Sequence, residues 1–142
     1  MILGTVYRST GSWYKVVTEK RTLNCRIQGK LRLDDVKSTN PVVVGDKVYI
    51  SLLNEIEGVI VKIMPRENYI IRKSVNLSKQ TQIIAANIDH AFLLITIDNP
   101  PTLTSFIDRL LVTTQAYIIN STLIFNKIDS YQAEINERMS EL

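Results

Sequence analysis

The stretch Leu123-Ile124-Phe125-Asn126-Lys127-Ile128-Asp129 decides how the second half of this chain folds. Three apolar residues are followed at once by a polar group of the form Asn-Lys-x-Asp. A short apolar run that ends in polar residues is typical of a buried strand followed by a loop. The sequence therefore predicts a strand over 121–125, with Asn126, Lys127 and Asp129 at its carboxyl end.

The side chains of this predicted loop suit recognition of a guanine base. The Asp129 carboxylate offers two acceptor oxygens, and guanine N1–H and N2–H₂ form a matching pair of donors. The Asn126 amide can bond the acceptor edge of the base, N7 and O6. The apolar stem of Lys127 can cover the base face. The alternative is an exposed turn in which Asp129 or Ser130 caps a following helix.

The sequence contains no phosphate-binding loop of the form G-x-x-x-x-G-K-[ST], whose glycines let backbone N–H groups surround the phosphates. No glycine follows Gly58, and Gly29-Lys30 is followed by Leu31. The Asp-x-x-Gly pattern that would contact a γ-phosphate is also missing. These 142 residues can present a guanine-recognition loop, but we predict no catalytic residue among them.

A different periodicity runs through the first half of the chain. Apolar residues alternate with polar ones, the period-two pattern of half-buried strands. Turn residues separate these runs, so about five short strands fit into roughly 65 residues, as in a small closed barrel. We predict an oligonucleotide/oligosaccharide-binding (OB) barrel, and an SH3-like barrel fits nearly as well. The alternating sets are Leu23, Cys25, Ile27; Val48, Ile50, Leu52; and Val59, Val61, Ile63.

The second half has the pattern of alternating strands and helices. Residues 91–97 are apolar on both faces, as expected of a central parallel strand. Apolar residues then recur at helical spacing after Pro101, and Thr102 or Thr104 can cap that helix. A polar amphipathic helix is expected over 130–142. Ligands bind at the carboxyl ends of such parallel strands, where Asn126 to Asp129 are expected. We divide the chain into a barrel (1–70), a linker (71–80) and a second domain (81–142).

Charge is distributed unevenly between the two halves. Residues 1–75 carry 13 Lys/Arg and 7 Asp/Glu, whereas residues 76–142 carry 4 and 7. This asymmetry indicates that the barrel meets a polyanion. Basic groups neutralise phosphates, and the nearby Tyr7, Trp13 and Tyr14 could stack on unpaired bases, unless Trp13 and Tyr14 belong to the core or rim of the barrel. The basic residues predicted to contact RNA are Arg8, Lys15, Arg26, Lys30 and Arg32.

Composition excludes several other kinds of site. The single cysteine, Cys25, rules out an internal disulfide and is expected to be a small core residue. The single histidine, His90, leaves no metal-ligand cluster and is expected to be a hydrogen-bonding residue at a strand end. No apolar run approaches the length that spans a membrane. A cytoplasmic protein without metal or membrane contacts is therefore predicted.

In the order and spacing of its motifs, the sequence resembles the circularly permuted GTPases of the RsgA/YjeQ family, which act on the small ribosomal subunit. The resemblance covers essentially the whole chain, although Ser130 stands where the family commonly has Leu. The motifs that carry it are Gly29-Lys30-Leu31-Arg32, Val44-Gly45-Asp46-Lys47-Val48, 58–66, Arg72, 85–89, Asp108-Arg109-Leu110 and Asn126-Lys127-Ile128-Asp129.

This resemblance implies an OB barrel that docks on ribosomal RNA, followed by the first part of a circularly permuted P-loop GTPase domain. The phosphate loop would come later in a longer protein that binds GTP or GDP with Mg²⁺ and has zinc in a C-terminal domain. Such a protein would hydrolyse GTP, stimulated by the small (30S) subunit during its maturation. Asn126, Lys127 and Asp129 would then bind the guanine. The alternative is a stand-alone OB-fold RNA-binding module without nucleotide function.

Overall fold

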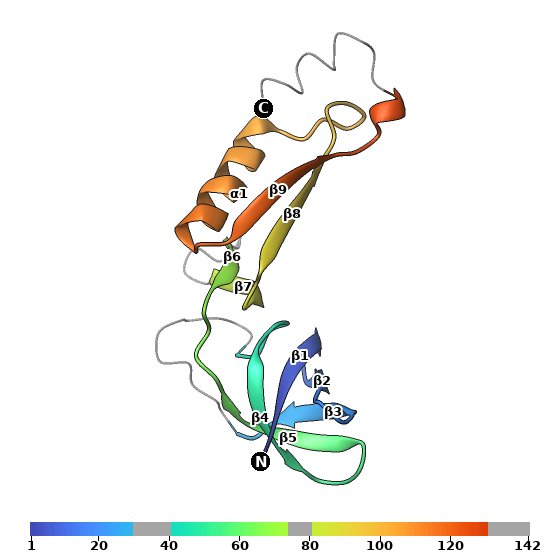
Figure 1. Cartoon of the computed structure of the whole chain (residues 1–142), viewed down its shortest axis with the longest axis vertical. Helices are drawn as coiled ribbons and strands as arrows, with labels where there is room; N and C mark the ends of the chain where they lie inside the picture. The colour runs from blue at the N-terminus through green and yellow to red at the C-terminus, as the bar shows by residue number, and fades with distance from the viewer. Residues whose placement is uncertain (30–40, 74–80, 131–142) are drawn as a thin grey trace. The chain divides into compact units, whose positions relative to one another are not determined.

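The computed structural model describes residues 1–29, 41–73 and 81–130 (Figure 1). The chain divides into two compact units, Met1–Ile88 and Asp89–Leu142. The first unit contains the strands β1 (Ile2–Thr10), β2 (Trp13–Val17), β3 (Thr22–Ile27), β4 (Lys47–Leu52), β5 (Glu57–Ile63), β6 (Tyr69–Lys73) and β7 (Thr81–Ala86). The second contains β8 (His90–Ile95), helix α1 (Thr104–Ala116), β9 (Asn120–Phe125) and the 3₁₀ helix η1 (Ile128–Ser130).

Strands β1 to β5 form a closed barrel in the order β1-β2-β3-β5-β4. The pairing of β3 with β5 is parallel, and the other neighbours are antiparallel. This mixed topology confirms the predicted five-stranded OB-type barrel. Alternating side chains point into the barrel and exclude water, as the period-two pattern required. The buried core residues are Val6, Tyr14, Val16, Leu23, Cys25, Val42, Val48, Ile50 and Ile60.

The predicted alternation of Val59, Val61 and Ile63 in β5 was wrong in one respect. Val59 and Val61 are only half-buried, whereas Ile60 between them is fully buried. The ladder with β4 shifts register between Tyr49 and Ile50, which leaves Val61 as an extra residue. A bulge of this kind breaks the strict alternation, so the inward positions pass from Ile60 to Ile63.

An antiparallel hairpin of β6 and β7 packs on the barrel through the segment before β4. The Ala86 N–H donates to the Val44 carbonyl at 2.9 Å, and Val43, Ile83 and Ala86 form a small buried cluster. The structure differs from the sequence-based division of the chain at the predicted linker. The linker was predicted to begin at residue 71, but β6 continues through Lys73. Tyr69 and Ile71 pack against this cluster, which favours a strand here. Residues 74–80 of the predicted linker lie outside the described residues.

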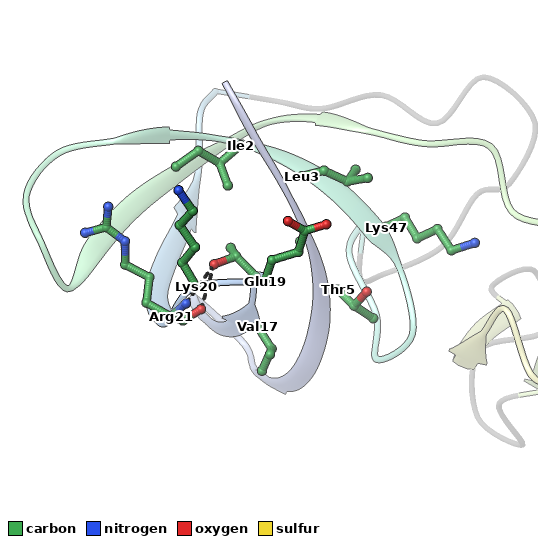
Figure 2. Close-up of a pocket in the computed structure, with 10 residues that line it drawn as sticks. Ile2, Leu3, Thr5, Val17, Glu19, Lys20, Arg21 and Lys47 are labelled. Carbon is green, nitrogen blue, oxygen red and sulfur yellow. Dashed lines mark hydrogen bonds between the residues drawn. The ribbon is translucent and has the colours of Figure 1, made fainter.

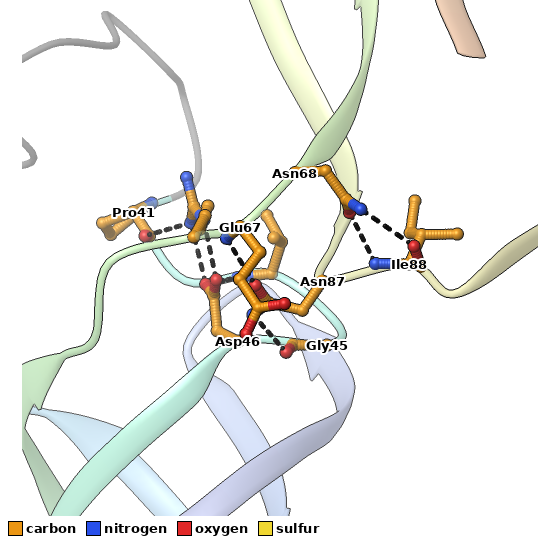
Figure 3. Close-up of polar contacts among 9 residues, drawn as sticks. Pro41, Gly45, Asp46, Glu67, Asn68, Asn87 and Ile88 are labelled. Atoms are coloured by element: carbon orange, nitrogen blue, oxygen red, sulfur yellow. Dashed lines mark hydrogen bonds and ion pairs between the residues drawn. The ribbon is translucent and has the colours of Figure 1, made fainter. Parts of the chain in front are cut away.

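A buried ion pair holds the segment before β4 in place (Figure 3). Asp46 is fully buried and accepts from Arg66 Nε at 2.6 Å and from Arg66 Nη2 at 2.8 Å. The Val43 N–H also donates to the carboxylate at 2.9 Å, and Arg66 Nη2 donates to the Pro41 carbonyl at 3.2 Å. Both charged groups therefore have hydrogen-bond partners, which is the condition for burying them without a large penalty.

Gly45 and Asn87 bring the hairpin close to the barrel. Gly45 has a φ of +89°, and a Cβ there would lie 1.9 Å from the Ala86 carbonyl oxygen, so no other residue fits without movement. The Asn87 amide donates to the Gly45 carbonyl at 2.9 Å, and its oxygen accepts from the Glu67 N–H at 2.9 Å. One amide side chain thus joins the two segments that lead into β4 and β6 (Figure 3).

In the second unit, β8 and β9 pair in parallel and α1 runs alongside them (Figure 1). The sheet face formed by Leu93, Ile95 and their neighbours packs against Ile107 of α1. The opposite face exposes Phe92, Leu94 and Ile124. The observed strand–helix–strand order confirms the expected βαβ unit, and the helix predicted over 130–142 lies beyond the described residues except for Ser130 in η1.

The prediction that Thr102 or Thr104 caps the helix was wrong. Leu103 occupies the N-cap position, and no side chain caps the helix. Thr102 instead closes the preceding loop, because its hydroxyl accepts from the Thr96 N–H at 3.0 Å and its own N–H donates to the Thr96 carbonyl at 2.8 Å. A side chain used in this way cannot reach the first turn of α1.

We expect Asp46→Ala to lower the free energy of unfolding by about 3–5 kcal/mol, because the Arg66 guanidinium would remain buried without its partner. Urea denaturation followed by circular dichroism would measure this loss. Lys47→Ala is the matched control, since Lys47 forms an exposed ion pair with Glu67 at 3.3 Å. The free energy of unfolding of the Lys47→Ala variant should fall by less than about 1 kcal/mol. Equal losses for the two variants would contradict the role given to the buried pair.

Burial raises the pKa of the Cys25 thiol to about 11, and a backbone hydrogen bond from Gly58 acts in the opposite direction. Because the thiolate is the reactive form, we expect iodoacetamide to alkylate the native chain at pH 8 at least about 100 times more slowly than the urea-unfolded chain. Mass spectrometry over time would measure both rates. Rapid labelling of the native chain would show that Cys25 is not a core residue.

Candidate functional site

The Asn-Lys-x-Asp loop lies where the sequence predicted it, at the carboxyl ends of the two parallel strands. Asn126 directly follows β9, and its N–H donates to the carbonyl of Ile95, the last residue of β8, at 2.9 Å. This bond fixes the loop to both strand ends. Asn126, Lys127 and Asp129 are all exposed, so each is accessible to a ligand.

Lys127 is anchored at both its backbone and its amine. Its φ of +61° lies in the left-handed region, and its carbonyl accepts from both the N–H and the hydroxyl of Ser130, at 3.0 and 2.8 Å. Its Nζ donates to the carbonyl of Asn99 in the loop that follows β8. The amine is therefore held against this loop, and the exposed stem of Lys127 is left as an apolar surface.

Asp129 belongs to η1 and is exposed. Within the described ranges, its carboxylate makes no hydrogen bond or ion pair with another side chain or backbone group. Both carboxylate oxygens are thus open to an external pair of donors, as guanine N1–H and N2–H₂ would supply. The helix that Asp129 or Ser130 might cap falls outside the described residues.

Other candidate sites in the second unit are structural. His90 Nε2 lies 2.8 Å from the Thr122 hydroxyl, which confirms the expectation of a hydrogen-bonding residue at a strand end. Among residues 1–29, 41–73 and 81–130, no group of three His, Cys, Asp or Glu side chains could hold a metal ion. No helix in this part of the chain is long and apolar enough to cross a membrane.

The barrel gathers three of the five predicted RNA-contacting residues on its outer surface. Arg8 of β1 lies directly opposite Lys15 of β2, and Lys15 lies opposite Asn24 of β3. The guanidinium carbon of Arg26 is 4.0 Å from the centroid of the Trp13 ring, a cation–π contact. Cross-strand pairs of like charge are destabilising, and a polyanion bound here would offset that cost. Lys30 and Arg32 lie outside the described residues.

The aromatic residues near this face have different roles. Tyr14 is a core residue whose hydroxyl donates to the Gly11 carbonyl at 3.1 Å, and burial raises its pKa. Trp13 and Tyr7 are 38% and 65% exposed. The β1–β2 ladder shifts register between Val6 and Arg8, so Tyr7 and Arg8 both face outward. Sequence alternation alone could not reveal this bulge.

A cleft on the barrel was not predicted from the sequence (Figure 2). It has a volume of about 520 Å³ and is formed by β1, the turn between β2 and β3, and Lys47 at the start of β4. Its residues are separated along the chain, and the adjacent basic residues Lys20 and Arg21 were the only local signal of it.

Two family models together match nearly the whole chain. The model for the RsgA N-terminal domain matches residues 3–60, and the model for the RsgA GTPase matches residues 63–142. The chain belongs to the RsgA GTPase family. A small ribosomal subunit biogenesis GTPase RsgA from Christiangramia forsetii is 63% identical over 135 residues, covering 92% of this chain and 43% of the relative. The protein of the same description from Flavobacterium johnsoniae is 60% identical over 131 residues, covering 89% and 40%.

Two solved structures share this architecture. The chain resembles YjeQ from Thermotoga maritima, with a TM-score of 0.69 and 27% identity over 99% of this chain and 46% of that one. It also resembles YloQ, described as a circularly permuted GTPase, with a TM-score of 0.64, 25% identity and the same coverage. Residues 63–142, which include β6, β7 and the second unit, are thus part of a GTPase domain. The chain spans less than half the length of these relatives.

We expect Lys15→Gln and Arg26→Gln each to weaken binding of a single-stranded RNA oligonucleotide. Each change should also reduce the slope of log K against log[salt] by about 0.7, because one phosphate contact is lost. Fluorescence anisotropy at several salt concentrations would measure both effects. Lys62→Gln, which removes an exposed charge from β5, is the control. If the Lys62→Gln variant lost as much affinity and salt dependence, RNA binding would depend on the net charge of the barrel and not on this face.

Proposed function

We propose that this chain is the rRNA-binding and guanine-recognising part of a GTPase that acts in maturation of the small ribosomal subunit. The observation that carries the proposal is the exposed Asp129 carboxylate at the carboxyl end of β9, with Lys127 anchored beside it. Family membership supports it, as does the similarity to small ribosomal subunit biogenesis GTPases. They also favour it over a stand-alone RNA-binding module.

In this proposal Asn126, Lys127 and Asp129 each make a different contact with the guanine base. Asp129 accepts from N1–H and N2–H₂, which adenine cannot supply as a pair, so it selects guanine. Asn126, held at the end of β8 by its N–H, directs its amide toward N7 and O6. The stem of Lys127 covers the base while its amine stays on the Asn99 carbonyl.

The phosphates of the nucleotide need residues that this chain does not supply. Most of the binding energy of a nucleoside triphosphate comes from its phosphates and Mg²⁺. In the complete protein we assign those contacts to the part of the relatives that extends beyond the matched region. GTP or GDP with Mg²⁺ is thus the proposed ligand, and GTP hydrolysis stimulated by the 30S subunit is the proposed activity. Zinc in a C-terminal domain stays a prediction from the resemblance.

The barrel is the proposed contact with ribosomal RNA. Its face of Arg8, Trp13, Lys15 and Arg26 combines cations with an aromatic ring already stacked by a guanidinium. Such a surface binds a phosphate backbone and unpaired bases together. A ribosomal partner is in keeping with the cytoplasmic location predicted from the sequence.

In the full-length protein, Asp129→Asn should weaken GDP binding by about 100-fold or more, because two hydrogen bonds to a charged acceptor are lost. The same variant should bind XDP better than the parent does, since the asparagine amide can donate to the 2-oxo group of xanthine. Competition with a fluorescent nucleotide would give both dissociation constants. Asp108→Asn, an identical change at an exposed position of α1, is the control and should leave selectivity unchanged.

For the 142-residue chain alone, we expect no GTP hydrolysis and only weak nucleotide binding, because it has no phosphate-binding loop. Isothermal titration calorimetry with GTP and a phosphate-release assay would measure these two quantities. Sub-micromolar affinity of the chain for GTP would contradict the proposal that phosphate contacts from outside this chain supply most of the binding energy.

A further inference from the structure

The amine of Lys127 is held by a loop that does not belong to the Asn-Lys-x-Asp motif. Its Nζ donates to the backbone carbonyl of Asn99, which lies between β8 and α1. Because β8 and β9 are parallel, the loops that follow them meet at the same end of the strand pair (Figure 1). The position of the Lys127 side chain is therefore set by the conformation of residues 96–102, which we call the Asn99 loop.

Thr96 and Thr102 close the base of the Asn99 loop. The Thr102 hydroxyl accepts from the Thr96 N–H at 3.0 Å, and the Thr102 N–H donates to the Thr96 carbonyl at 2.8 Å. The Thr96 hydroxyl donates to the Pro100 carbonyl inside the loop. The N–H, the carbonyl and the hydroxyl of Thr96 are thus all used to hold the loop closed.

The carbonyl that meets Lys127 is also fixed from within the loop. Asn99 has a φ of +51°, in the left-handed region that asparagine tolerates better than most residues. The Asp98 carboxylate accepts from the Asn99 N–H at 2.9 Å and from the Asn99 side-chain amide at 3.3 Å. Both donors of Asn99 are therefore bonded to Asp98, and its carbonyl accepts from the Lys127 amine.

Restraint of the amine matters because a lysine side chain is long and flexible. Lys127 is exposed, so an unrestrained stem would sample many rotamers. Ser130 holds its backbone carbonyl and Asn99 holds its amine, which fixes the side chain at both ends. A group that already has its bound conformation loses less entropy on binding. The Asn99 loop thus prepares the stem of Lys127 to cover a base before the nucleotide arrives.

The hydroxyl of Thr102 serves the Asn99 loop and not the elements on either side of it. No side chain caps α1, whose N-cap position is occupied by Leu103. The pairing of β8 with β9 and the bond from the Asn126 N–H to the Ile95 carbonyl do not involve Thr102. Loss of this hydroxyl should therefore leave the strands and the helix in place and change mainly the loop.

We propose that Thr96 and Thr102 are positioning residues for guanine recognition. Their hydroxyls close the Asn99 loop, the closed loop holds its carbonyl against the Lys127 amine, and the restrained stem of Lys127 covers the base. The two threonines act through Lys127 and do not contact the nucleotide themselves. This inference rests on the proposed function, to which it adds two residues outside the Asn-Lys-x-Asp motif that determine the affinity for GDP.

Substitution of Thr102 in the full-length protein tests the inference. Thr102→Val keeps the shape of the side chain but removes the acceptor for the Thr96 N–H, so the dissociation constant for GDP should rise about fivefold. Thr102→Ser keeps the hydroxyl and should restore the parent's affinity. Thr104→Val, the same change at the exposed first residue of α1, is the matched control and should change the affinity by less than about twofold. Competition with a fluorescent nucleotide would give each dissociation constant.

A double-mutant cycle separates positioning of Lys127 from a general effect on the fold. Lys127→Met removes the amine but keeps an apolar stem, so it should weaken GDP binding at least as much as Thr102→Val does. In the Lys127→Met background, Thr102→Val should cause no further loss, because both changes break the same chain of contacts. Thermal unfolding would verify that the variants are folded. Thr96→Val, which removes only the bond to the Pro100 carbonyl, repeats the cycle if Thr102→Val does not fold.

The other outcomes distinguish this inference from the proposed function. Unchanged GDP affinity in Thr102→Val, an equal loss in Thr102→Ser, or an equal loss with and without the Lys127 amine would overturn the inference. The proposed function would still stand if Asp129→Asn gained affinity for XDP in the same assay. If Asp129→Asn kept the parent's preference for GDP, guanine recognition by this motif would be wrong, and the inference would fail with it.

Discussion

The buried ion pair between Asp46 and Arg66 is the interaction on which the first unit depends. Its two members are 20 residues apart, one before β4 and the other after β5, and the carboxylate also accepts from the Val43 N–H. An unpaired charge at this position would cost several kcal/mol, so the pair forms only when both segments are in place. Once they are, Gly45 and Asn87 can approach each other and the β6–β7 hairpin packs on the barrel.

The closed barrel then separates two kinds of surface by their chemistry. One face combines paired cations with an exposed tryptophan and suits a polyanion. The turn between β4 and β5 instead exposes Leu53 and Ile56, and its backbone is closed by hydrogen bonds to the Asn54 side chain. A closed sheet has no free edge to pair with a partner, so recognition falls to side chains on the outside and to the turns.

In the second unit, the parallel pair of strands determines the position of the Asn-Lys-x-Asp loop. Because β8 and β9 run in the same direction, their carboxyl ends meet, and Asn126 is joined to Ile95 by a backbone bond. The Asn99 carbonyl, from the other loop at this edge, holds the Lys127 amine. The sequence predicted the position of the motif because strand and loop are contiguous, but not the contact with Asn99, which depends on two loops meeting across the sheet.

The sequence by itself determined the barrel, the βαβ unit and the position of the Asn-Lys-x-Asp loop, because each is encoded in local periodicity and in adjacent residues. Tertiary structure alone decided which residues depart from that periodicity. The register shifts at Tyr7 and Val61 arise from how neighbouring strands pair, so no pattern within one strand contains them. The same holds for the partner of Asp46 and for the cleft beside Arg21. These features join residues far apart in the chain, and their contacts exist only after the barrel has closed.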